Sequence, residues 1–107
     1  MTLIEVVAIM VDADGNDEDT FGGETGTPQY YQVKYTLQEH LGENNELLFY
    51  NNDLRDTFII ETKEGENKNR INQYIDIIQN IYQAFANGFN QDIYQDRHLR
   101  FEIINVK

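Results

Sequence analysis

The chain has 107 residues, a formal net charge of -11 at pH 7 and no cysteine. This length fits one domain, 1–107, with a core that needs neither a disulfide nor a metal. A negative field repels nucleic acid and anionic membrane, so we expect cationic partners and no direct nucleic-acid or membrane binding. The longest apolar run, Val6 to Val11, is too short for a membrane span, and we expect a soluble cytoplasmic protein.

Residue types that are rare or missing argue against an enzyme. Serine and cysteine are both absent, which excludes acyl transfer through either nucleophile. His40 and His98 stand far apart, without the spacing of a zinc site, and the glycines at 22, 23 and 26 lack the Lys-Ser/Thr of a phosphate-binding loop. The sequence therefore predicts a non-enzymatic protein without a cofactor.

The first half of the chain is predicted to be β-structure. Leu3 to Val11 is apolar on both alternating faces, which is typical of a central strand covered on both sides. Tyr30 to Gln38 alternates between apolar and polar residues and predicts a half-buried antiparallel strand. Leu47 to Tyr50 and Thr57 to Thr62 predict a hairpin whose turn is Asn51-Asn52-Asp53.

The hydrophobic period changes near Asn67, a suitable N-cap for a long helix. We expect Asn87-Gly88 to end this helix, 90–97 to add a short helical turn, and the alternation from Leu99 to Val106 to form a final strand. The apolar stripe that should pack on the sheet consists of Ile71, Ile75, Ile78, Tyr82 and Phe85. The fold class is therefore α+β: an antiparallel or mixed sheet of four to five strands with one long helix packed across it.

An acidic, glycine-rich loop between Val11 and Tyr30 is the main candidate site. Its candidate partner-binding residues are Asp12, Asp14, Asp17, Glu18, Asp19 and Glu24, with no Lys or Arg before Lys34. The loop starts in the register of an EF-hand but has Gly15 at the fourth position and Gly23 where the bidentate Glu belongs. A weak divalent-ion site, a two-metal nuclease site and a loop that only confers solubility are the alternatives, and no metal site is predicted.

The same carboxylates could imitate a nucleic-acid backbone. Double-stranded DNA carries about one negative charge per 1.7 Å of its axis, so a row of Asp and Glu can occupy a groove built for phosphates. Glu39, Glu43 and Glu46 are further candidates for this row. A flexible loop would weaken such binding, because it must become ordered on contact.

The end of the predicted helix carries a family resemblance. The stretch Phe85-Ala86-Asn87-Gly88-Phe89-Asn90-Gln91, followed by an acidic turn and an alternating segment, resembles a small, acidic, phage-encoded type II-A anti-CRISPR protein. The resemblance covers about a quarter of the chain and implies an inhibitor of the DNA-binding surface of Cas9, in an infected or lysogenic bacterial host. The chain departs from that pattern because Arg97, His98 and Arg100 follow the motif and most acidic residues lie at the other end.

The leading hypothesis is a non-enzymatic anti-defence inhibitor that binds a cationic surface of Cas9 or its guide-RNA complex. The alternative is a phage or bacterial structural or assembly protein that oligomerises through its helix face or its strand edges. If the acidic loop is not the binding site, the polar helix face at Asn72, Asp76, Gln79 and Gln83, or the segment from Asn87 to Asp96, is the next candidate. The sequence leaves the target, the inhibited step and the oligomeric state open.

Overall fold

The sheet is built around β1 (Thr2–Val11), which is paired along both of its edges. A computed structural model of the chain describes residues 1–21, 26–41, 47–52, 54–63, 67–89 and 97–107. Along one edge, β1 pairs with β4 (Thr57–Thr62) and then with β2 (Asp17–Phe21). Along its other edge, β1 pairs with β5 (His98–Val106). The strand β3 (Leu47–Asn52) pairs with β4, on the side of β4 away from β1. All these pairings are antiparallel, and the prediction of a central first strand is confirmed.

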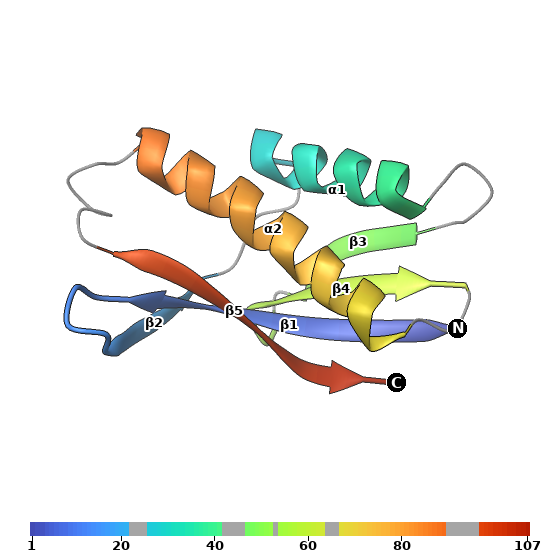
Figure 1. Cartoon of the computed structure of the whole chain (residues 1–107), viewed down its shortest axis with the longest axis horizontal. Coiled ribbons are helices and arrows are strands. Elements are labelled where there is room, and N and C mark those ends of the chain that lie inside the picture. Colours follow the sequence, from blue (N-terminus) through green and yellow to red (C-terminus); the bar gives the residue numbers. More distant parts are fainter. Residues whose placement is uncertain (22–25, 42–46, 53, 64–66, 90–96) are drawn as a thin grey trace.

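Two helices, α1 (Pro28–Leu41) and α2 (Lys68–Phe89), cover one face of the sheet (Figure 1). Ile4, Val6 and Ala8 of β1 point toward them and are fully buried. The opposite face has no helix over it among the described residues, and Val7 and Ile9 are half-buried there. The prediction that β1 is covered on both sides was therefore wrong, because the long apolar run serves one helix-covered face and one open face.

The segment predicted as a strand from Tyr30 to Gln38 is the helix α1, so this prediction was also wrong. Tyr30, Val33 and Leu37 follow helical spacing and all three are buried, and Val33 and Leu37 also fit the predicted alternation. The feature that favours a helix over a strand here is the pair Thr27-Pro28. Thr27 Oγ1 accepts a hydrogen bond from the Tyr30 amide at 3.3 Å, and Pro28 begins the helix at the position where a missing N–H costs nothing.

The second helix, α2, confirms the predicted N-cap. Asn67 Oδ1 accepts a hydrogen bond from the Arg70 amide at 2.9 Å. Four members of the predicted stripe, Ile71, Ile75, Ile78 and Tyr82, are buried, whereas Phe85 is half-buried. The helix does not end at Asn87-Gly88, as predicted, but at Phe89.

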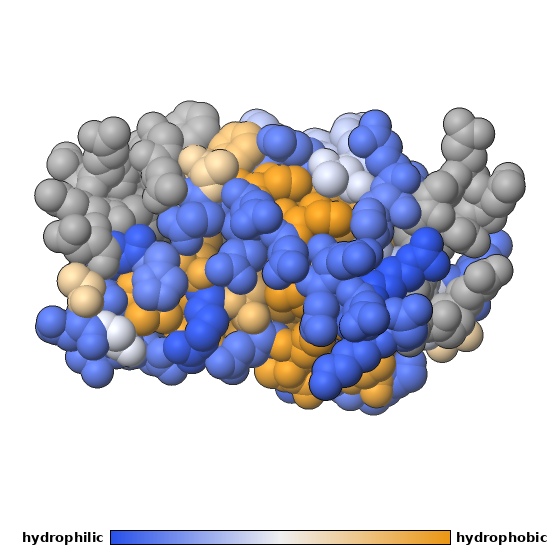
Figure 2. Space-filling view, in the orientation of Figure 1, coloured by the Kyte–Doolittle hydropathy of each residue, from blue (hydrophilic) through white to orange (hydrophobic). Residues whose placement is uncertain are grey.

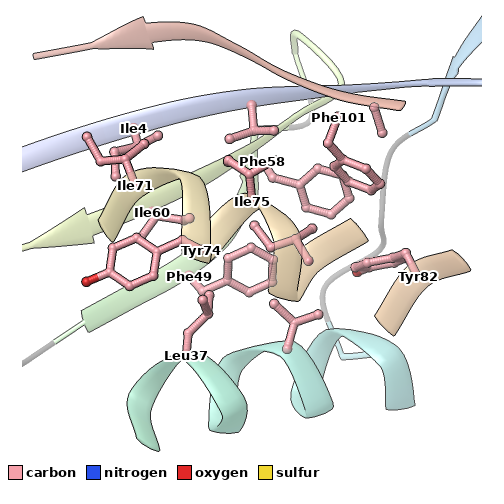
Figure 3. Close-up of a cluster of buried hydrophobic side chains, with 14 of the residues drawn as sticks. Ile4, Leu37, Phe49, Phe58, Ile60, Ile71, Tyr74, Ile75, Tyr82 and Phe101 are labelled. Carbon is pink, nitrogen blue, oxygen red and sulfur yellow. The ribbon is translucent and has the colours of Figure 1, made fainter. Parts of the chain in front are cut away.

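The core lies between the two helices and the covered face of the sheet (Figure 3). Aromatic rings form its centre: Phe58 stacks on Phe49 with ring centroids 5.9 Å apart, and its other neighbours are Tyr82 at 5.1 Å and Phe101 at 5.8 Å. Such offset and edge-on contacts add to the free energy gained by burying the rings. Both helices and the strands β1, β3, β4 and β5 contribute to this cluster.

Two other predicted features differ from the structure. The acidic segment is not all loop, because Asp17 to Phe21 forms β2. The predicted turn begins later than expected, since Asn51 and Asn52 still belong to β3. The short helical turn predicted at 90–97 lies outside the described residues except for Arg97. With five strands and two helices, the α+β class is confirmed, although the predicted single long helix is accompanied by α1.

Candidate partner-binding site

The tip of the β1–β2 hairpin is a turn that Asp12 organises. Asp12 Oδ1 accepts hydrogen bonds from the amides of Asp14 and Asn16, each at 2.9 Å. The Asp12 backbone closes the same turn with Asn16 and Gly15, and Gly15 has a φ of 84°, which favours glycine. One oxygen of Asp12 therefore holds the turn, while Asp14 is exposed at its tip.

Beyond the turn, the acidic residues continue along β2 rather than along a loop. Asp17 lies opposite Val11 and Asp19 lies opposite Met10, with Glu18 as the extra residue of a bulge. Asp19 Oδ1 accepts a hydrogen bond from the amide of Thr20 at 2.8 Å. Pairing with β1 thus places these carboxylates on ordered backbone.

Asp17 makes a bidentate ion pair with Arg100 of β5. Arg100 Nη1 lies 3.0 Å from Asp17 Oδ1, and Nη2 lies 3.0 Å from Oδ2. Because β2 and β5 flank opposite edges of β1, this contact spans β1 on the open face of the sheet. Arg100 Nε also contacts Glu102 Oε1 at 2.9 Å, and the hydrogen bond to Asp17 is the main cause that raises the pKa of Arg100.

Glu18 makes the second ion pair between the hairpin and the start of β5. Arg97 Nε donates to Glu18 Oε2 at 2.7 Å, and this hydrogen bond raises the pKa of the guanidinium. Both arginines are exposed enough that solvent and salt weaken the attraction. Asp17 and Glu18 therefore tie the hairpin to β5, a role that the sequence did not indicate.

The predicted site residues thus fall into three groups. Asp17 and Glu18 are paired with arginine and Asp12 adds, after Glu18, to the attraction that raises the pKa of Arg97, whereas Asp14 and Asp19 form no ion pair with any described Lys or Arg. Glu24 lies outside the described residues. Of the additional candidates, Glu39 is exposed on helix α1, and the positions of Glu43 and Glu46 are not described.

The carboxylate of Glu5 is buried on the open face and joins β1 to β4, a role that the sequence did not indicate. Glu5 is 3% exposed, and its Oε2 accepts a hydrogen bond from Thr57 Oγ1 at 2.6 Å. Arg55 Nη1 lies 3.5 Å from the other carboxylate oxygen. The only sequence signal was a single Glu inside an apolar strand, and the partners come from β4 and the turn before it.

The geometry gives no positive support to the metal-site alternatives. Within the described ranges, His, Asp and Glu side chains form no group of three or more placed to hold an ion. Asp12 of the EF-hand register caps a turn, and Glu18 of that register is bonded to Arg97. Neither described helix is long and apolar enough to cross a membrane.

Comparison of the chain with protein-family models, with curated proteins and with solved structures found no match.

Proposed function

We propose that the chain is a non-enzymatic inhibitor that binds a cationic protein surface with its β1–β2 hairpin. The observation that carries this proposal is the placement of five carboxylates, at Asp12, Asp14, Asp17, Glu18 and Asp19, on one hairpin with defined backbone geometry. Less conformational entropy is lost on binding from a paired strand than from a flexible loop. The main objection to an acidic loop as a binding site is thereby weakened.

The distribution of charge supports the same proposal. Arg97 and Arg100 neutralise two of these carboxylates, and they also fix the hairpin against β5. Asp14 and Asp19 then present negative charge that the described cations do not pair, while Asp12 acts on Arg97 in addition to Glu18. Such a group attracts a basic surface at long range and would make association faster at low salt.

The partner that we propose is Cas9 or its guide-RNA complex. Its Arg- and Lys-rich surfaces bind DNA phosphates and read the short motif beside the target. The resemblance of 85–91 to an anti-CRISPR protein motivates this choice of target. The acidic hairpin supplies a physical means of competing with DNA, and the chain would then act in the cytoplasm of a bacterial host.

The experiment removes three charges without removing a hydrogen bond. In the variant D12N/D14N/D19N, Asn retains the Oδ1 acceptors used at positions 12 and 19, and both arginine pairs remain intact. We expect weaker inhibition of DNA cleavage by a Cas9-type effector, with a smaller difference between low and high salt. Melting curves establish that the variant is folded.

A matched control removes the same number of charges elsewhere. Glu61, Glu64 and Glu66 lie outside the hairpin in the sequence, and none of them is a candidate binding residue. E61Q/E64Q/E66Q has the same net charge as the hairpin variant and should inhibit nearly as well as wild type. Equal inhibition by a folded hairpin variant and wild type would exclude the hairpin as the binding surface. Absence of inhibition by wild type would exclude the effector tested.

A further inference from the structure

Strand β5 is an edge of the sheet, because among the described residues it pairs with β1 alone. Apolar side chains are exposed along its C-terminal half: Ile103 by 38%, Ile104 by 44% and Val106 by 50%. Figure 2 shows apolar surface where this half of β5 runs along the bottom of the molecule. A long edge strand with exposed apolar residues is a template for pairing with another strand.

The hydrogen-bonding pattern identifies which peptide groups of β5 face this edge. Leu3 and Lys107 exchange both backbone hydrogen bonds, at 3.0 and 2.9 Å, so the odd-numbered residues of β1 direct their peptide groups toward β5. In β5, the residues paired with Ile9 and Val7 are Arg100 and Glu102, and their backbone peptide groups point toward β1. The peptide groups of Leu99 and Phe101 therefore point away from β1, toward the edge.

An independent contact agrees with this assignment. The amide of Leu99 donates to Gln83 Oε1 of α2 at 2.7 Å, so it does not serve the ladder with β1. The Gln83 side chain thus covers one backbone donor of the edge, in the manner by which proteins limit edge pairing. Phe101, two residues further along, has the same peptide orientation.

We propose that two copies of this chain associate by antiparallel pairing of their β5 strands, centred on Phe101. In this register Phe101 pairs with Phe101 of the second copy through two backbone hydrogen bonds, and Leu99 lies opposite Ile103. Arg100 then lies opposite Glu102 of the second copy, and Glu102 lies opposite Arg100. The strand is therefore complementary in charge to itself, which selects a second copy as the occupant.

The geometry of the non-hydrogen-bonded positions strengthens this charge match. Arg100 and Glu102 occupy the positions at which directly opposed residues have the closest Cα atoms, about 4.5 Å apart. In the single chain they already contact each other along one strand, and Arg100 also contacts Asp17. Pairing would join the charges of the two copies into one alternating network on the open face. Complete pairing also requires Leu99 to exchange Gln83 for a carbonyl of the second copy.

The test uses charge reversal and mixing, read by sedimentation velocity over a range of concentrations. Arg100→Glu places Glu opposite Glu, and Glu102→Arg places Arg opposite Arg, so each variant alone should dimerise about tenfold or more weakly than wild type. An equimolar mixture restores both opposite-charge pairs and should form a heterodimer. A wild-type chain that stays monomeric, a single variant that dimerises normally, or a mixture without heterodimer would overturn the proposal.

Two further measurements do not depend on the folding of these variants. Backbone amide exchange at Phe101 in the wild-type chain should slow as protein concentration rises, because its N–H becomes bonded in the dimer. Gln83→Ala should tighten association, since it frees the Leu99 amide for pairing. Concentration-independent exchange at Phe101 would refute pairing through this edge even if the chain dimerised elsewhere.

Discussion

The contact between Thr57 and Glu5 allows a sharp test of what holds the open face together. Both residues are almost completely buried, and the 2.6 Å hydrogen bond is charge-assisted if Glu5 is ionised. Thr57→Val keeps the shape of the side chain but removes the donor. A hydrogen bond to a charged group contributes roughly 1.5 to 3 kcal/mol, so we expect a loss of that size in the free energy of unfolding.

Urea titration followed by circular dichroism provides the measurement, with the slope m required to stay constant so that the midpoint reports stability. Thr57→Ser is the matched control: it retains the hydroxyl and removes one methyl group, and it should cost about 1 kcal/mol. Glu5→Gln removes the charge, so adding Thr57→Val to it should cost less than in wild type. Equal losses for Thr57→Val and Thr57→Ser would refute the reasoning, because the methyl group and not the hydrogen bond would then account for the effect.

Three further predictions test the burial of particular side chains by the same urea titration. Ile78→Ala should cost about 2 to 5 kcal/mol because Ile78 is fully buried, whereas Gln79→Ala should cost far less, and equal losses would mean that α2 is rotated. Val6→Asp should prevent folding because Val6 faces the helices, but Ile9→Asp, on the open face, should leave a folded, weaker protein; a fully unfolded Ile9→Asp chain would contradict that placement. Burial raises the pKa of Tyr82 above its ordinary 10.0, so the native state holds this proton more tightly than the unfolded chain does. The contribution of this group to the free energy of unfolding is complete below pH 10.0 and falls as the pH rises further. Tyr82→Phe should therefore lose less stability than wild type above this pH. An equal loss in both proteins would contradict this explanation.

Periodicity predicted the elements whose apolar residues allow one interpretation. The runs that became β1, β4 and α2 were identified because each is long or strongly patterned. Helix α1 was misassigned because Val33 and Leu37 fit both an alternating strand and a helical stripe, which a short segment cannot distinguish. The Thr27-Pro28 cap is the local feature that favours the helix over the strand.

The candidate site was less predictable because its partners are distant in sequence. The acidic residues themselves were found, but Arg97 and Arg100 lie 79 and 83 positions from the carboxylates that they bind. Such contacts depend on β1 bringing β2 and β5 to its two edges, and no local pattern encodes that arrangement. The same reason explains why Thr57, 52 positions from Glu5, could not be assigned to it.

The pairing of β1 with β5 sets an order of events during synthesis. Among the described strands, the one that is synthesised first pairs with the one that is synthesised last. At about 5 to 20 residues per second, the apolar β1 waits roughly 5 to 20 s for that partner. β2 and β4 are made earlier and pair with the other edge of β1, so only the edge that faces β5 stays available to chaperones and to β1 segments of neighbouring nascent chains. Production of this protein should therefore depend on chaperone capacity more than its small size suggests.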